Sequence, residues 1–128
     1  MPHSAVNTHD LIVTIVKKGW VEKIVDASRK AGAEGGTIIP GRGIGIHESK
    51  KLLGIPIEPE KEILLTLVPK EITDEVLSAI IEAGELNKKG TGVGFVLDLK
   101  RVVGIVHFLE QLGYQEDQGG EKQENREE

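Results

Sequence analysis

The chain carries its apolar residues in two different rhythms. Four aliphatic runs, rich in β-branched side chains, have the length of buried strands: residues 11–16, 37–39, 63–68 and 94–97. Two other stretches place apolar residues on one face of a helix: residues 21–28 and 72–81. Gly32 and Gly84 follow these stretches, where the end of a helix favours glycine. The pattern therefore predicts four strands and two helices.

The order of these elements predicts the fold. A strand, a helix and a strand precede a long loop, and the same three elements follow it, as in the ferredoxin-like split βαβ unit. This α+β fold is a βαβ-βαβ sandwich, with a four-stranded antiparallel sheet and two helices on one face. Because the strands are aliphatic at nearly every position, the other face also needs an apolar cover, and we expect self-association there. Residues 101–112 fit a short helix or a fifth strand equally well.

Charge separates the end of the chain from its body. We expect residues 1–8 to form a flexible lead-in and residues 9–114 to form the folded domain. Residues 115–128 hold six acidic residues against Lys122 and Arg126, and carry −4 of the net charge of −5. This acidic tail is expected to be disordered. The rest of the chain, at −1, has no basic stripe of the kind that binds nucleic acid.

Composition excludes several classes of function. The chain has 128 residues and no cysteine, which excludes disulfides, thiolate metal sites and cysteine nucleophiles. Its few aromatic residues argue against a surface on which nucleic-acid bases stack. The best apolar run, residues 11–16, is far shorter than the roughly 20 residues of a membrane span. We expect a cytoplasmic protein with no membrane insertion and no nucleic-acid partner.

Two glycine-rich segments are candidate ligand sites. Gly41–Gly45 opens a loop that extends to Pro59, and loops of this length are usually functional or disordered. Its Gly-x-Gly-x-Gly pattern fits a phosphate-cradling turn or a simple hairpin extension. Gly90–Gly94 follows Lys88 and Lys89, and its N–H groups favour an anion, although a tight turn with positive φ angles is the structural alternative. In a ferredoxin-like fold both segments leave the same end of the sheet.

Catalytic and metal chemistry find little support in the sequence. No two of the four histidines, His3, His9, His47 and His107, have the spacing of a helical metal pair. His47 lies beside Glu48 in the long loop, where a solvated histidine is the favoured interpretation. The residues form no evident Ser-His-Asp arrangement or catalytic carboxylate pair. We expect a protein that is not an enzyme and has no metal site.

The chain resembles the PII nitrogen-regulatory proteins over roughly residues 9–106. The resemblance rests on the order of elements, on the second-helix stretch Ile72–Ile80, on the glycine-rich turn after that helix, and on the closing segment Asp98–Val103. It implies a homotrimer whose sheets pack around a central axis, with an adenine nucleotide in each cleft between subunits. Three loops of the family wall this cleft: the T-loop, here 43–60, the B-loop, here 84–93, and the C-loop, around 100–107.

Several residues match the nucleotide site that this resemblance implies. Thr37 falls on an adenine-contacting threonine, and Gly43 and Gly45 fall on two glycines at the root of the T-loop. Gly90 and Gly92 match the Gly-x-Gly of the B-loop. The residues that we expect at the nucleotide are Thr37, Gly43, Gly45, Lys88, Lys89, Gly90, Thr91, Gly92, Val93 and Arg101.

The family's phosphate-binding cations have no counterpart here. The B-loop lysine falls on Val93, and the two C-loop arginines fall on Gly104 and Val106. At ~1.5–3 kcal/mol for each charged hydrogen bond, this loss is expected to weaken the binding of ATP or ADP, and a less charged effector such as AMP or a cyclic nucleotide fits better. The T-loop glutamine falls on His47, and the long loop has no tyrosine for uridylylation. The candidates for replacement cations are Lys88, Lys89, Arg42 and Arg101.

The resemblance implies a sensor with no obligatory cofactor. The nucleotide would order the long loop, which would dock on or release a membrane transporter or a metabolic enzyme. The loop residues expected at this partner are Arg42, His47, Glu48, Lys50 and Lys51. One alternative is a trimeric metal- or ion-binding protein like the copper-tolerance relatives that share the fold, with His47, Glu48 and His107 as ligands. Another is a structural trimer that acts through its loop and tail.

Overall fold

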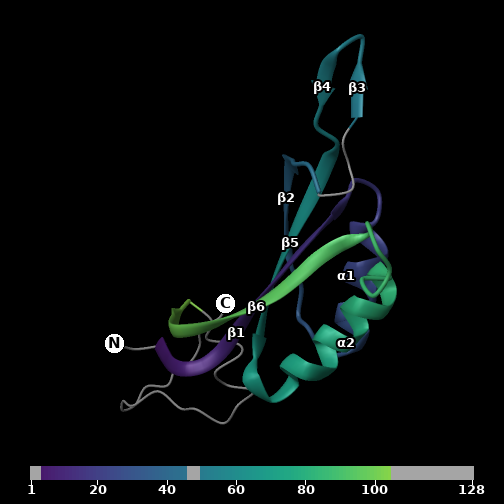
Figure 1. Ribbon diagram of the computed structural model, residues 1–128. Helices are drawn as coiled ribbons and strands as arrows, with labels where there is room; N and C mark the ends of the chain where they lie inside the picture. The colour runs from purple at the N-terminus through teal and green to yellow at the C-terminus, as the bar shows by residue number, and fades with distance from the viewer. Residues whose placement is uncertain (1–3, 46–49, 105–128) are drawn as a thin grey trace, which may run out of the picture.

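The computed structural model describes residues 4–45 and 50–104. Its elements are β1 (Ser4–Lys17), α1 (Val21–Lys30), β2 (Thr37–Arg42), β3 (Lys50–Leu52), β4 (Ile55–Ile57), β5 (Glu60–Pro69), the 3-10 helix η1 (Lys70–Ile72), α2 (Thr73–Gly84) and β6 (Gly92–Val103). Four strands form an antiparallel sheet in the order β2-β5-β1-β6, with both helices on one face (Figure 1). The predicted ferredoxin-like fold is confirmed.

The core lies between the sheet and the two helices. Alternate residues of the central strands β1 and β5 face α1 and α2, and the i, i+4 pair of α2 packs onto them. All of these side chains are almost fully buried: Ile12, Val16, Ile24, Leu64, Val68, Val76 and Ile80. The helix spacing in the sequence therefore marks the faces that the structure buries.

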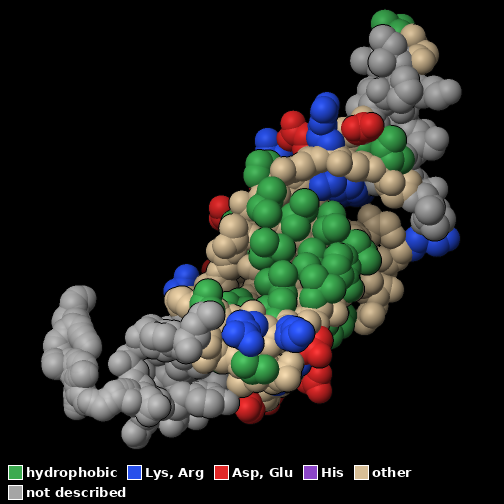
Figure 2. Space-filling model, turned by 90° about the vertical axis from the view of Figure 1, so that its left-hand side faces the viewer, with side chains coloured by type: hydrophobic (Ala, Val, Ile, Leu, Met, Phe, Trp, Pro, Cys, Tyr) green, Lys and Arg blue, Asp and Glu red, His purple; other side chains and the backbone are tan. Residues whose placement is uncertain are grey.

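The opposite face of the sheet is apolar and open. The register places Phe95 of β6 beside Val13 of β1, and Leu97 beside Leu11, on the side away from the helices. Phe95 and Leu97 are 43% and 46% exposed. Figure 2 shows apolar side chains gathered across the centre of this face, with charged side chains around them. A contiguous exposed patch of this kind is typical of an interface.

β1 is longer than the sequence indicates. It begins at Ser4, so residues 4–8 belong to the strand and not to a flexible lead-in. A β-bulge interrupts its pairing with β6 between Val6 and His9, and Asn7 adopts a positive φ of 59° there. Asparagine tolerates this left-handed conformation better than most residues. Because a bulge breaks the two-residue alternation of a strand, it conceals this extension from the sequence pattern.

β6 also extends beyond the predicted run 94–97, and reaches Val103. Residues 101–103 are therefore strand, which settles the first part of the stretch for which the sequence allows helix or strand. The strand ends before Gly104, which has a φ of 82°, and residues 105–112 and the expected acidic tail, 115–128, lie outside the described residues.

Part of the long loop is a second, two-stranded sheet. β3 and β4 pair antiparallel, with Leu52 opposite Ile55, and the chain turns at Leu53 and Gly54. This β3–β4 hairpin stands away from the main sheet, at the end where β2 finishes and β5 begins (Figure 1). The hairpin extension expected for the loop is therefore present, while a phosphate at Gly41–Gly45 stays a prediction.

A partly buried polar cluster ties the other end of the sheet to α2. The carboxylate of Asp10, a residue 8% exposed, accepts hydrogen bonds from Lys70 Nζ at 2.6 Å and from Thr73 Oγ1 at 2.7 Å. Lys70 Nζ also lies 2.6 Å from Oδ1 of Asp98, which is directly opposite Asp10 in the register. Burial raises the pKa of Asp10, but the bonds from Lys70 and Thr73 outweigh burial and hold that pKa below its ordinary value. In the same cluster, burial lowers the pKa of His9.

Candidate functional site

Both glycine-rich segments leave the same end of the sheet, as predicted. Gly41 lies opposite Lys61, Lys61 opposite Lys17, and Gly92 opposite Val16. The two segments are nevertheless on opposite edges, because β2 and β6 are the outer strands and β5 and β1 lie between them. A single chain therefore presents two separate candidate half-sites, one at each edge of its sheet.

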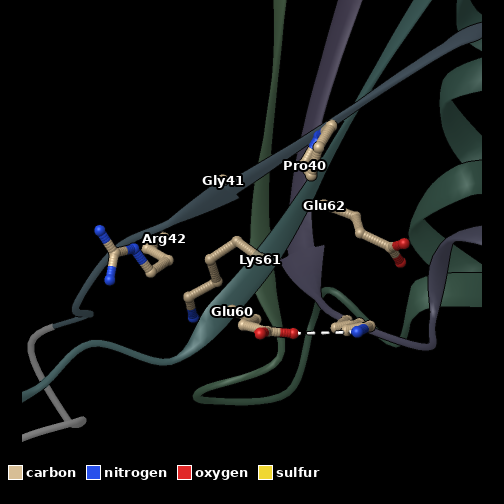
Figure 3. Close-up of a pocket in the computed structure, with 7 residues that line it drawn as sticks. Pro40, Gly41, Arg42, Glu60, Lys61 and Glu62 are labelled. Carbon is tan, nitrogen blue, oxygen red and sulfur yellow. Dashed lines mark ion pairs between the residues drawn. The ribbon is translucent and has the colours of Figure 1, made fainter.

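The first half-site is the root of the T-loop. Gly43 N donates a hydrogen bond to Pro59 O at 3.2 Å, which closes the loop at its base, and Lys18 N donates to Glu60 O at 3.2 Å. Beside this base lies an open pocket of about 400 Å³ (Figure 3). The residues that line it are Lys18, Pro40, Gly41, Arg42, Glu60, Lys61 and Glu62.

Charges of both signs line this pocket. Lys18 Nζ lies 3.0 Å from Glu60 Oε1, and this contact raises the pKa of Lys18. Both side chains are mostly exposed, so the ion pair contributes little to stability. Glu62 Oε1 accepts a hydrogen bond from Gly19 N at 3.1 Å. Arg42, at the end of β2, forms no ion pair with another described residue, so its guanidinium is available to an anion.

The second half-site is the B-loop, which its own hydrogen bonds hold in place. Thr91 Oγ1 lies 2.7 Å from Glu85 O and 3.0 Å from Lys88 O. Lys88 Nζ lies 3.1 Å from Glu85 Oε1. Two of the predicted nucleotide contacts, Thr91 and Lys88, thus have structural partners within the loop. Lys89 and Gly90 are exposed.

Two glycines of the B-loop, Gly90 and Gly92, are required for different structural reasons. Gly92 has a φ of +154°, and a Cβ atom there would lie 2.5 Å from Ile15 O and 2.9 Å from Val16 Cγ1. Its close approach to β1 therefore demands glycine whether or not a ligand binds. Gly90 has a φ of +81° with open space around it. The turn alone favours glycine at that position.

The comparisons with known proteins identify the family. The model of the family "Nitrogen regulatory protein P-II" matches residues 9–107. The chain belongs to the P-II family. The family consists of signalling regulators, which makes this chain a PII-like signal protein. No curated protein matches it.

A crystal structure of Arabidopsis thaliana PII bound to citrate has the fold of this P-II chain. Its TM-score is 0.62, and the two sequences are 23% identical over 77% of this chain and 84% of that one. At this level of identity the likeness concerns the fold alone.

The predicted nucleotide residues of this P-II chain form three separate groups. Thr37 lies opposite Leu65 on the same edge as Gly43, but at the start of β2, about 20 Å along the strand from Gly43 at ~3.3 Å per residue. Val93, 50% exposed, is the last residue of the B-loop and lies at the β6 edge. Arg101, opposite Val6, is exposed and lies about 30 Å along β6 from the B-loop at ~3.3 Å per residue. Within one chain the structure keeps these groups apart.

The remaining predicted residues belong to the long loop and the C-terminal stretch. Lys50 and Lys51 lie in β3. His47, Glu48 and His107, the ligands of the alternative metal-binding interpretation, lie outside the described residues. Within 4–45 and 50–104, no three or more His, Cys, Asp or Glu residues are grouped so that they could hold a metal ion. No helix in that part of the chain is long and apolar enough to cross a membrane.

The sequence interpretation missed the charged lining of the T-loop root. Lys18 marks the end of a strand in the sequence, while Glu60, Lys61 and Glu62 are the approach to the next strand. Their separation of more than 40 residues gives no local signal that they meet. Only the antiparallel register of β1 and β5 brings them together among the described residues, because Lys17 lies opposite Lys61.

Proposed function

We propose that this P-II protein is a homotrimeric sensor that binds an adenine nucleotide between its subunits and regulates a partner protein through the β3–β4 hairpin. One observation carries the proposal: the T-loop root and the B-loop share one end of the sheet but occupy opposite edges. A site that needs both is complete only where two copies meet. The apolar open face supplies a reason for the copies to meet.

The open face supports the trimer. Burial of exposed aliphatic and aromatic surface stabilises an assembly by about 25 cal/mol per Å². Val93, Phe95 and Leu97 are each 43–50% exposed in the single chain and form a continuous row on β6. Packed around a common axis, three such faces would exclude water from these side chains. Light scattering tests this directly, and we expect a mass three times the 13.9 kDa of one chain.

The charges of the half-sites favour an effector with few phosphates. Lys88 is paired with Glu85, and Val93 supplies no cation. Arg42, Lys89 and the N–H groups of the B-loop are left to contact an anion, with Arg101 available from a neighbour. This set suits one phosphate or a cyclic phosphate better than the triphosphate of ATP.

Calorimetry and thermal unfolding of the full chain test the nucleotide site. The probes are ATP, ADP, AMP, cyclic AMP and 2-oxoglutarate, with citrate included because the Arabidopsis PII structure holds it. A ligand at 100 times its Kd stabilises the folded protein by about 2.7 kcal/mol, a shift in Tm of several degrees. We expect the largest shift with AMP or the cyclic nucleotide.

A pair of variants at Thr37 separates specific binding from general stabilisation. Thr37→Val removes a hydroxyl on the exposed β2 edge, and we expect affinity for the nucleotide to fall roughly tenfold, the loss of one hydrogen bond. Thr37→Ser keeps the hydroxyl and serves as the control. A trimer that gives no response to any nucleotide at millimolar concentration contradicts the proposal.

A further inference from the structure

The turn of the β3–β4 hairpin contains an unexpected residue. Leu53 is 93% exposed and has a φ of +53°, and Gly54, which follows it, has a φ of +81°. A two-residue hairpin turn with two positive φ angles favours Asn-Gly or Asp-Gly, since asparagine and aspartate tolerate the left-handed conformation. Leucine is unfavourable there on two counts, because its backbone is strained and its side chain is in water. Neither the fold nor solubility explains it.

The surroundings of Leu53 resemble the centre of an interface. The sequence from 52 to 57 contains no charged residue, while Lys50 and Lys51 precede it and Glu58 and Glu60 follow it. The hairpin forms its own two-stranded sheet, separate from the main one. An isolated two-stranded hairpin is marginally stable in water, so a covered tip stabilises it. An apolar centre with a charged rim is the arrangement of a protein–protein contact.

We propose that Leu53 is the apolar anchor by which the hairpin docks into an apolar pocket of a partner protein. This inference rests on the proposed regulation through the hairpin and names the chemistry of the contact. Charges of both signs flank the tip, which favours a protein rim over an anionic membrane surface that attracts cations alone. Leu53 is a single exposed side chain at a turn that stands away from the main sheet (Figure 1), and such a side chain fits a pocket better than the flat open sheet of a second copy.

The first step of the test identifies the partner. The full chain with p-benzoylphenylalanine at position 53 is expressed in the native cell, irradiated, and the crosslinked protein is identified and purified. Its affinity is then measured for the wild-type chain and for two variants. Leu53→Asn removes the apolar side chain but suits the left-handed backbone, and Leu53→Met keeps an apolar side chain of similar size. Both are expected to keep the wild-type Tm and the wild-type response to nucleotide.

The expected effect follows from the burial of one leucine side chain. We expect Leu53→Asn to weaken binding roughly 10- to 100-fold, and Leu53→Met to stay within about threefold of the wild type. Equal affinity of Leu53→Asn and wild type overturns the inference while the regulation through the hairpin stands. A wild-type chain that lacks both the nucleotide response and any partner contradicts the proposed function instead.

Two further results would assign the tip to another occupant. If the wild type crosslinks to no protein but binds vesicles of phosphatidylethanolamine and phosphatidylglycerol, and Leu53→Asn abolishes this binding, the anchor contacts lipid and the inference is overturned. If Leu53→Asn lowers the mass of the assembly, the tip contacts a second copy, and the inference is overturned as well.

Discussion

Two hydroxyl groups in the core form no hydrogen bond with any other described residue. Thr14 of β1 and Thr66 of β5 are fully buried on the helix-facing side of the sheet. Thr14 lies opposite Leu64, and Thr66 lies opposite Ile12, so aliphatic side chains adjoin both hydroxyls. In the unfolded chain each hydroxyl binds water. Folding removes these partners, which makes both threonines unfavourable to stability.

Replacing either threonine by valine is therefore expected to stabilise the protein. A buried hydroxyl without a partner costs about 1–3 kcal/mol, and the methyl group that replaces it adds under ~1 kcal/mol of favourable burial. Small adjustments of the core offset part of this gain. We expect Thr14→Val and Thr66→Val each to raise the free energy of unfolding by about 1–2 kcal/mol. For a chain of this length that corresponds to a rise in Tm of roughly 3–8 °C.

Urea unfolding with a matched control measures the effect. Thr73→Val is the same substitution at another buried threonine, but Thr73 Oγ1 donates to Asp10 Oδ2 at 2.7 Å. We expect this control to lower the free energy of unfolding by about 1.5–3 kcal/mol, because it removes a hydrogen bond to a charged group. The dependence of stability on urea should stay the same in all variants, so that the midpoints compare directly.

A loss of stability in Thr14→Val or Thr66→Val would refute the reasoning, because it would mean that the hydroxyl has a partner in solution. The double variant then identifies that partner. Thr14 and Thr66 are diagonal neighbours on adjacent strands, about 7–8 Å apart. If one internal water bridges both hydroxyls, the two single effects will not add in the double variant. Additive gains, by contrast, support two independent unsatisfied groups.

Three further predictions concern the polar cluster and the B-loop. Burial lowers the pKa of His9, so below the unfolded value of 6.5 the unfolded chain binds a proton that the folded chain does not. The free energy of unfolding should therefore fall as the pH drops below 6.5. His9→Leu should remove this dependence on pH from unfolding measurements between about pH 7 and 5. Lys70→Met leaves Asp10 and Asp98 facing each other without a cation. Because the ion pair that lowers the pKa of Asp10 is lost, we expect a lower Tm near neutral pH. The difference from the wild type should narrow as the pH falls and Asp10 is protonated, whereas a Tm difference that does not change with pH would contradict the assigned role of Lys70. Gly92→Ala should destabilise the chain by about 2–4 kcal/mol through its clash with Ile15 O, and Gly90→Ala, with open space around it, by about 1 kcal/mol; equal effects in thermal unfolding would contradict the packing argument.

The sequence predicts those parts of the fold in which burial repeats regularly. The helix-facing residues Ile12 and Val16 and the helix pair Val76 and Ile80 have the spacing of their elements, and their burial is the reason for that spacing. The start of β1 was not predictable in this way, since the bulge at Asn7 breaks the alternation. A short hairpin without a core face has no periodic signal either, which explains why the long loop allowed more than one interpretation.

The candidate site was predicted less completely than the fold, because local motifs do not contain the register. The two glycine-rich segments were correctly assigned to one end of the sheet. Their placement on opposite edges follows from the strand order, in which β5 and β1 separate them. The pairing of Lys18 with Glu60 and the cluster around Lys70 each join residues more than 25 positions apart. No spacing rule connects such residues.

The B-loop indicates which features of the family's pattern depend on the fold and which depend on a ligand. Gly92 is required by its approach to β1, and the hydroxyl of Thr91 holds the loop through Glu85 O and Lys88 O. Matches at these positions would persist in a chain that bound no nucleotide at all. A phosphate-binding cation stabilises no part of the scaffold, and the resemblance implies that Val93 stands where the family has its B-loop lysine. The pattern thus keeps what the architecture needs and departs where only the effector's charge is at stake, which is the outcome expected if the same cleft accepts a ligand with fewer phosphates.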